Sequence, residues 1–281
     1  MDSQYKTVEI LRKGRETEDA GNARVLRAFG SHESPSFDPF LQFDELRSGK
    51  RAAFSRGFPW HPHRGIVTLS YVFNGRIEYE DQNGSKTVIS AGDVILMHTG
   101  RGMIHKETPE ATQEHWAVHL WLNVPGTMKM EPPTTNIFKE DDIPVYRGND
   151  GLIVKVLSGE FRGISGPMRE YCLRSFLDIH VPPLSTFTHY IPGDETAFAY
   201  ILEGNADSPN LPGGRYSRGD VFLYGEGDTV AFGSEEEELR IILCSGIPIG
   251  EPVAWHGPIV MNTRDELDEA YKQYEEGTFL D

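Results

Sequence analysis

Residues 66–90 read IVTLSYVFNGRIEYEDQNGSKTVIS. Apolar and polar side chains alternate in three short runs, which are separated by Asn74-Gly75 and Asn83-Gly84. Alternation is typical of strands that bury one face, and Asn-Gly favours a tight β-turn because both residues tolerate a positive φ. The stretch therefore predicts three consecutive strands joined by two hairpin turns.

The same pattern continues through most of the chain. Further runs of this kind lie at 93–97, 116–123, 152–157, 171–181, 198–202, 220–224 and 239–243. Helical signal is found mainly near the C-terminus, where Thr263 and Glu266 form a capping box ahead of apolar residues at helical spacing. The predicted fold class is all-β with a short C-terminal helix.

The two halves of the chain resemble each other. The match involves two pairs of segments at nearly equal offsets, namely SAGDVIL (90–96) with SRGDVFL (217–223) and YVFNG (71–75) with YILEG (200–204). Similarity at a fixed spacing indicates a duplicated structural unit. We therefore predict two tandem β-barrels over 1–135 and 136–281, with a polar connector near Pro132-Pro133 and Asp141-Asp142 and the helix in the second barrel.

The chain is strongly acidic. Its 281 residues include 27 Lys or Arg and 43 Asp or Glu, which leaves a formal net charge of −16. Nucleic-acid affinity depends largely on basic side chains that neutralise phosphates, and the chain has no basic run. It also has no apolar stretch of 18 residues and no apolar secretory segment at its N-terminus. We expect no direct nucleic-acid binding, no membrane partner and a cytoplasmic location.

Four side chains form two closely spaced pairs. His61 and His63 are two residues apart, as are His105 and Glu107. Residues two apart on a strand share a face, so two such strands across a barrel would bring four ligands together. One His-x-His alone is commonly structural, but the second pair favours a metal site. Three imidazoles and one carboxylate suit several divalent ions and leave positions open for water or substrate, which favours catalysis.

The sequence around these residues resembles the cupin superfamily and, within it, the pirin family. The matching stretches are GFPWHPHRG (57–65), GDV (92–94), TGRGMIHKE (99–107), LWLNVP (120–125) and GPIVMNT (257–263). The resemblance implies two cupin-type jelly-roll barrels and one mononuclear metal in the first, bound by residues that match His61, His63, His105 and Glu107. The metal is usually iron, here expected as Fe(II), and the same donors also accept Ni, Cu, Mn, Co or Zn.

The second barrel is expected to lack a metal site. The repeat offsets set four residues against His61, His63, His105 and Glu107, and these are, in that order, Tyr190, Pro192, Phe232 and Ser234. None of the four suits the site, and His189 would need a shift of one residue in register. The second barrel is therefore predicted to supply stability.

Other side chains near the ligand motifs are candidates for a pocket. His119 stands where pirins often carry Gln. It could hydrogen-bond a metal ligand and fix its orientation, accept a proton, or simply lie at the surface, and we favour the first role. Phe58 and Trp60 flank the first pair and can wall a pocket for an aromatic substrate, although aromatic residues near turns are more often core. Arg101 can hold an anionic group, or simply pair with a neighbouring carboxylate.

The resemblance implies two functions of different class. Pirins include quercetin 2,3-dioxygenases, which open a flavonol ring with O2; there the metal would bind a substrate hydroxyl and Glu107 would accept its proton. Pirins also include redox-sensing, iron-binding regulators that act through protein partners without turnover. We favour the dioxygenase and a small aromatic substrate, because an open coordination position suits a reaction.

Overall fold

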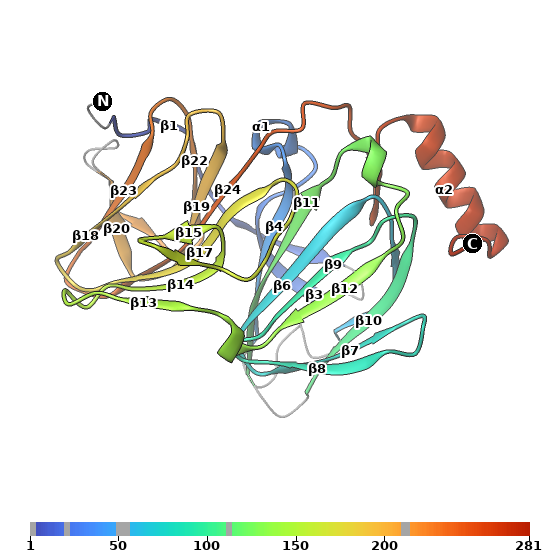
Figure 1. Ribbon diagram of the computed structural model, residues 1–281, viewed down its shortest axis with the longest axis horizontal. Coiled ribbons are helices and arrows are strands. Elements are labelled where there is room, and N and C mark those ends of the chain that lie inside the picture. The colour runs from blue at the N-terminus through green and yellow to red at the C-terminus, as the bar shows by residue number, and fades with distance from the viewer. Residues whose placement is uncertain (1–3, 20–22, 49–56, 111–113, 209–213) are drawn as a thin grey trace. The chain divides into compact units, whose positions relative to one another are not determined.

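The computed structural model describes residues 4–19, 23–48, 57–110, 114–208 and 214–281. Its contacts group into two compact units, and most of their strands are labelled in Figure 1. We call them the N-terminal barrel (Glu16–Pro35, Phe40–Glu140 and Ile249–Asp281) and the C-terminal barrel (Met1–Arg15, Ser36–Pro39 and Asp141–Pro248). Among the described residues, no helix combines the length and the apolarity needed to cross a membrane.

Each barrel includes one end of the chain from the opposite half of the sequence. Strand β1 (Val8–Lys13) hydrogen-bonds to β22 (Asp220–Tyr224) in the C-terminal barrel. Helix α2 (Arg264–Glu276) packs its buried face against β26 (Ile259–Met261) in the N-terminal barrel. These units therefore differ from two continuous segments divided after residue 135, because strand pairing and helix packing bring distant segments together.

The N-terminal barrel is built from two antiparallel sheets. Within the described residues, the larger sheet runs β12 (Thr134–Phe138), β9 (Val94–His98), β6 (Ile66–Asn74), β11 (His115–Asn123), β4 (Phe40–Ser48), β3 (Ala23–Phe29) and β2 (Arg15–Asp19). The smaller sheet runs β5 (Phe58–His63), β10 (Met103–Pro109), β7 (Arg76–Asp81) and β8 (Lys86–Ser90).

The C-terminal barrel repeats this order with one difference at the edge, where β1 from the start of the chain stands in place of β12, which follows β11 in sequence. Its larger sheet runs β1, β22, β19 (Thr196–Glu203), β24 (Leu239–Gly246), β17 (Leu173–Val181), β14 (Ile153–Ser158) and β13 (Val145–Arg147). Its smaller sheet runs β18 (Thr186–Tyr190), β23 (Thr229–Ser234), β20 (Asn205–Asp207) and β21 (Tyr216–Ser217). The predicted duplication of an all-β barrel is confirmed.

Short elements complete the description. They are α1 (Ser34–Phe37), β15 (Glu160–Phe161), β16 (Ile164–Ser165), β25 (Ala254–His256) and the 3₁₀ turns Gly126–Met128 and Glu140–Asp142. The C-terminal helix begins as predicted, because the Thr263 hydroxyl accepts a hydrogen bond from the Glu266 amide and the Glu266 carboxylate accepts one from the Thr263 amide.

The two Asn-Gly turns have different roles. Asn83-Gly84 connects β7 to β8, which pair directly, so the predicted hairpin is confirmed. Asn74-Gly75 connects β6 to β7, which lie in different sheets, so the hairpin predicted there is wrong. The reason is that β6 already pairs with β9 on one side and β11 on the other, which leaves no free edge for β7.

The interior of the N-terminal barrel changes from apolar to polar along its strands. Its apolar part includes Val25, Leu46, Val72 and Ala117, which point inward from neighbouring strands of the larger sheet. Further along the same strands, inward positions carry polar and aromatic side chains that line a cavity. In the C-terminal barrel the corresponding inward positions are mostly apolar and belong to the core cluster, with the buried Ser175 and Ser245 as polar exceptions.

Candidate metal centre

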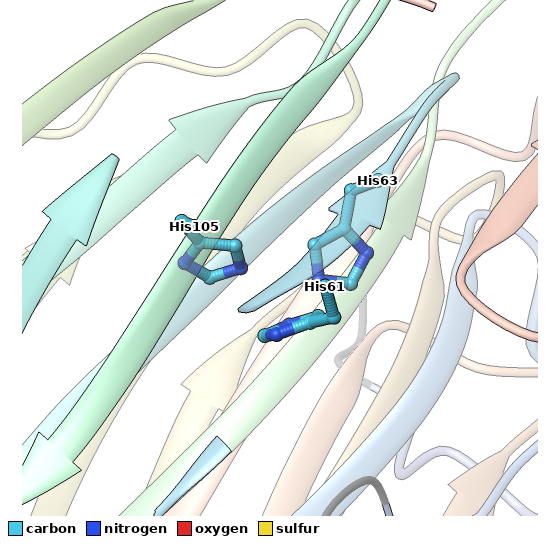
Figure 2. A group of neighbouring side chains, drawn as sticks. All are labelled: His61, His63 and His105. Carbon is cyan, nitrogen blue, oxygen red and sulfur yellow. The ribbon is translucent and has the colours of Figure 1, made fainter. Parts of the chain in front are cut away.

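Three histidines lie close together inside the N-terminal barrel (Figure 2). His61 and His63 come from β5 and His105 from β10, and the two strands pair with His105 opposite His61. One ring nitrogen from each histidine lies within 4.8 Å of the others. The i, i+2 spacing places His61 and His63 on one face, as the sequence predicts. This arrangement could hold a metal ion.

Backbone carbonyls orient two of the rings. Nδ1 of His61 lies 2.7 Å from the Pro59 carbonyl oxygen, and Nδ1 of His63 lies 3.2 Å from the Pro258 carbonyl oxygen. A proton on each Nδ1 would satisfy these contacts and leave Nε2 with a lone pair. Metal-binding histidines are commonly held in this way by a hydrogen bond on the second ring nitrogen.

The ring of His105 fits a metal ligand for a different reason. Both of its nitrogens are buried, and within the described part of the chain neither has a hydrogen-bond partner. Leaving a buried polar atom unsatisfied costs free energy, so such an atom calls for an external partner. Burial, and next the neighbouring His61, lower the pKa of His105 well below 6.5. The ring is therefore neutral, which is the form that binds metals.

Glu107 lies beside the histidines, not among them. The register between β10 and β5 shifts after His105, because β5 carries one extra residue there, so that Glu107 pairs with Phe58. Its Oε2 lies 3.5 Å from Nε2 of His119, and the group of mutually close ligand atoms found among the described residues contains the three histidines only. The role of Glu107 as fourth ligand therefore stays a prediction.

The environment of Glu107 also makes it a candidate base. Its side chain is buried, and burial raises the pKa of Glu107 to about 7, while a hydrogen bond from Ser70 opposes the shift. A carboxyl group with a pKa close to the working pH can take up and release a proton during a reaction.

The histidines open into a cavity of about 390 Å³ within the N-terminal barrel. Cavities of a few hundred Å³ with apolar walls and a few polar groups are typical small-molecule sites. The apolar and aromatic walls are Phe58, Met97, Trp121 and Trp255, and the polar lining includes Arg27, Ser31, Gln42, Asp44, Thr68, Ser70, Glu107 and His119.

The four predicted pocket residues separate into two groups. Phe58 and His119 line the cavity. Trp60 does not, because neighbours on a strand face opposite ways and His61 points inward; Trp60 is 46% exposed and lies 5.1 Å from the Lys106 ammonium. Arg101 lies in an exposed turn before β10 and is also absent from the lining. The structure thus places Trp60 and Arg101 outside the pocket, contrary to the expectation.

Sequence reasoning missed several lining residues. Gln42 and Asp44 stand two apart in a largely apolar run, which is the same signal that identified the histidines, but neither residue is a histidine and no second motif drew attention to them. Trp255 belongs to a segment far along the chain, so only the fold could bring it to this cavity.

Comparison with known proteins identifies close relatives over nearly the whole chain. The Pirin family model matches residues 22–122, and the model of the Pirin C-terminal cupin domain matches residues 176–280. A pirin-like protein of Caulobacter vibrioides is 36% identical over 274 residues, which cover 95% of this chain and 96% of that protein. Pirin-1 of Arabidopsis thaliana is 39% identical over 262 residues, which cover 92% of this chain and 89% of that protein.

A solved structure shows the same architecture. Quercetin 2,3-dioxygenase from Acinetobacter baumannii superposes with a TM-score of 0.89 at 25% sequence identity, over 98% of this chain and 99% of that chain. The likeness extends through both barrels, so the duplicated arrangement described above is that of a known group of proteins.

Proposed function

This chain belongs to the pirin family, and on that basis we propose that its N-terminal barrel is a metal-dependent dioxygenase site that opens the ring of a flavonol-like substrate with O2. The observation that carries the proposal is a cluster of three histidines that opens into a cavity of small-molecule size. The structural likeness to a quercetin 2,3-dioxygenase supports the choice of reaction.

The proposed ligands of one divalent transition metal are His61, His63, His105 and Glu107. Fe(II) is the first candidate, and the nitrogen and oxygen donors also fit Ni, Cu, Mn, Co or Zn. When bound, the metal would supply a Lewis acid and, where the ion is redox-active as Fe(II) is, a redox centre for the reaction of the substrate with O2.

The remaining steps belong to side chains of the chain itself. Glu107 would take the proton from a substrate hydroxyl, since its pKa of about 7 suits that transfer. His119, with Nε2 3.5 Å from the Glu107 carboxylate, would hold that carboxylate in position. Trp121 and Trp255, whose ring centroids are 5.9 Å apart, would offer apolar surface to a planar ring and keep water from it.

The test begins with metal content, measured by elemental analysis on protein purified without a metal-affinity tag. We expect about one equivalent of metal and O2-dependent consumption of quercetin, and we expect His61→Ala and Glu107→Ala to abolish turnover. His180→Ala is a matched control, because His180 belongs to the C-terminal barrel, where it contacts Asp178 and Glu238.

Two results would contradict the proposal. Protein without metal would remove the site assignment. Metal-loaded protein that consumes no flavonol with any of the candidate ions would instead favour the alternative, an iron-binding redox-sensing regulator acting through protein partners. A cytoplasmic location and the absence of direct nucleic-acid binding remain predictions from the sequence, to be checked by fractionation and by binding assays.

A further inference from the structure

Four polar side chains form a row across the inner face of the larger sheet of the N-terminal barrel. Backbone pairing sets Ser70 opposite His119, His119 opposite Asp44, and Asp44 opposite Arg27, on the adjacent strands β6, β11, β4 and β3. Residues opposite each other on paired strands share a face. All four line the same cavity, and we call them the polar row.

The C-terminal barrel has an apolar row in the corresponding place. The offset that relates Tyr71 to Tyr200 relates Ser70 to Ala199. Continuing across the sheet from Ala199, strand pairing leads in turn to Leu243, Leu177 and Val156, all of which are buried. This barrel therefore folds with apolar side chains at these positions.

The contrast between the rows indicates that the polar row serves something other than the fold. Taking polar and charged groups out of water costs free energy, and well-packed apolar residues often replace a buried ion pair without loss of stability. The duplicated barrel shows such an apolar solution in the same chain. A ligand that hydrogen-bonds to the polar row would explain why the N-terminal barrel carries it.

The far end of the polar row is a closed, rigid ion pair. Arg27 Nε donates to Asp44 Oδ1 at 2.8 Å, and Arg27 Nη2 donates to Asp44 Oδ2 at 2.7 Å. Gln42 Nε2 adds a third hydrogen bond to Asp44 Oδ2 at 2.9 Å. Paired donors of this kind fix the geometry of both side chains, and the two opposite charges compensate each other. Arg27, Asp44 and Gln42 therefore form a cluster at the cavity wall that has no net charge and offers both donor and acceptor atoms.

This cluster lies at a distance from the histidines that suits a ring-shaped ligand. Glu107 approaches the sheet at His119 on β11. Asp44 lies one strand further and Arg27 two strands further, and neighbouring strands are about 4.8 Å apart, so the cluster spans roughly 5 to 10 Å from His119. A ligand with one group at the histidines could place a ring substituent at the Arg27–Asp44 pair.

We propose that Arg27, Asp44 and Gln42 select ligands that carry an uncharged hydroxyl at the end remote from the three histidines, and disfavour ligands that carry a carboxylate there. The inference rests on the proposed function only in placing the other end of the ligand at the histidines. A hydroxyl can donate to the Asp44 carboxylate or the Gln42 amide oxygen and also accept from Arg27. A carboxylate can only accept, and it is repelled by Asp44 in a partly desolvated site.

The inference is tested with three synthetic ligands that differ at one position, 3-hydroxyflavone and its 4′-hydroxy and 4′-carboxy derivatives. The full chain is loaded with Zn²⁺, which is redox-inert, so that binding is measured without turnover. Quenching of tryptophan fluorescence reports occupancy because Trp121 and Trp255 line the cavity. We expect the 4′-hydroxy compound to bind about fivefold to tenfold more tightly than the parent, and the 4′-carboxy compound at least about tenfold more weakly.

The decisive variant is Asp44→Asn, which removes one charge at nearly constant shape. Because it leaves the Arg27 cation without its counter-charge, the 4′-carboxy compound should gain at least about tenfold in affinity relative to the 4′-hydroxy compound. Asp178→Asn is the matched control, since Asp178 forms the same two-point pair with Arg240, at 2.9 and 2.7 Å, in the C-terminal barrel. It should leave the affinity ratio unchanged.

A milder variant covers the case in which Asp44→Asn does not fold. Gln42→Met keeps the Arg27–Asp44 pair and should reduce the advantage of the 4′-hydroxy compound to about twofold. Equal affinities of the wild-type protein for the hydroxy and carboxy compounds would overturn the inference, as would the absence of binding by all three or an equal effect of Asp178→Asn and Asp44→Asn.

The outcomes separate this inference from the proposed reaction. If the zinc-loaded protein shows the expected ratios but the iron-loaded protein consumes no O2 with quercetin, the dioxygenase proposal fails and the selectivity of the cavity stands. If O2 is consumed while the three compounds bind equally well, the reaction stands and the role of Arg27, Asp44 and Gln42 is rejected.

Discussion

The two barrels share one strand order and fill it in opposite ways. In the N-terminal barrel β10 and β5 pair His105 with His61, whereas in the C-terminal barrel the equivalent strands β23 and β18 pair Phe232 with Phe187. Those phenylalanine rings stack with centroids 6.2 Å apart and belong to a continuous apolar core. The comparison teaches that the fold requires only side chains of suitable size at these positions. A few inward side chains can therefore turn a structural barrel into a binding site.

The pairing also corrects the expected equivalence of the two halves. The repeat offsets placed Tyr190 against His61. Strand pairing from Phe232 instead sets Phe187 against His61 and His189 against His63. This comparison takes Phe232 as the equivalent of His105, as the repeat offset predicts. The offset differs slightly from one strand to the next because connecting loops differ in length, and one residue of error reverses which face a side chain occupies.

The largest effect is expected when the His61–His105 pair is replaced by the phenylalanine pair of the C-terminal barrel, in the double variant His61→Phe and His105→Phe. Zinc sites with four protein ligands bind with about 10–16 kcal/mol, so the loss of two ligands should weaken metal binding by on the order of 10⁴-fold. Competition with a chromophoric chelator measures this affinity. A variant that keeps wild-type affinity would show that these histidines are not the ligands.

The reverse experiment removes the aromatic filling of the C-terminal barrel. Phe232→Ala should lower the free energy of unfolding by about 3–5 kcal/mol, because it deletes a fully buried ring and leaves a cavity. Urea unfolding followed by tryptophan fluorescence measures the change. Metal content should not change, and a variant that loses metal together with stability would show that the two barrels do not divide these tasks.

Metal should stabilise the chain through the N-terminal barrel. At a free concentration 100 times its Kd, a metal that binds only the folded state adds about 2.7 kcal/mol to the free energy of unfolding. Differential scanning fluorimetry with and without added metal measures the resulting shift in Tm. The shift should be absent in His105→Ala and retained in His189→Ala; the same shift in both variants would contradict the assignment.

The smallest effect concerns His189 of the C-terminal barrel. His189 packs against Phe161 and Phe187, and burial lowers the pKa of His189 to about 4. The unfolded chain takes up a proton near pH 6.5 and the folded chain only near pH 4, so the stability present above pH 6.5 falls as the pH drops between these values.

His189→Gln removes this dependence. Between pH 7 and pH 4.5 we expect the free energy of unfolding of the variant to fall by about 1–2 kcal/mol less than that of the wild type, allowing for partial exposure of His189. Urea unfolding at the two pH values measures the difference, and other ionisable groups cancel because both proteins share them. An identical pH dependence in both proteins would show that His189 does not titrate differently on folding.

Several features of the candidate site could be predicted because they depend on neighbours along the chain. The spacing of His61 and His63 alone places both rings on one face of β5, and the second pair on another strand indicated a meeting point. Glu107 lines the same cavity as His105, as the spacing predicts, but its carboxylate lies beside His119 and outside the group of mutually close ligand atoms. That position depends on the side chains packed around the carboxylate, which the spacing does not encode.

The sequence by itself determined the all-β class, the duplication, the C-terminal helix and the histidines, because alternation, turn residues, capping and i, i+2 spacing are local consequences of backbone geometry. Only the tertiary structure decided that β1 and α2 complete the barrels of the opposite halves of the chain, and that Arg27, Asp44 and Trp255 share a cavity with the histidines. Those arrangements depend on which strands pair and which surfaces pack across long separations in sequence, and many pairings compete until the whole core is buried.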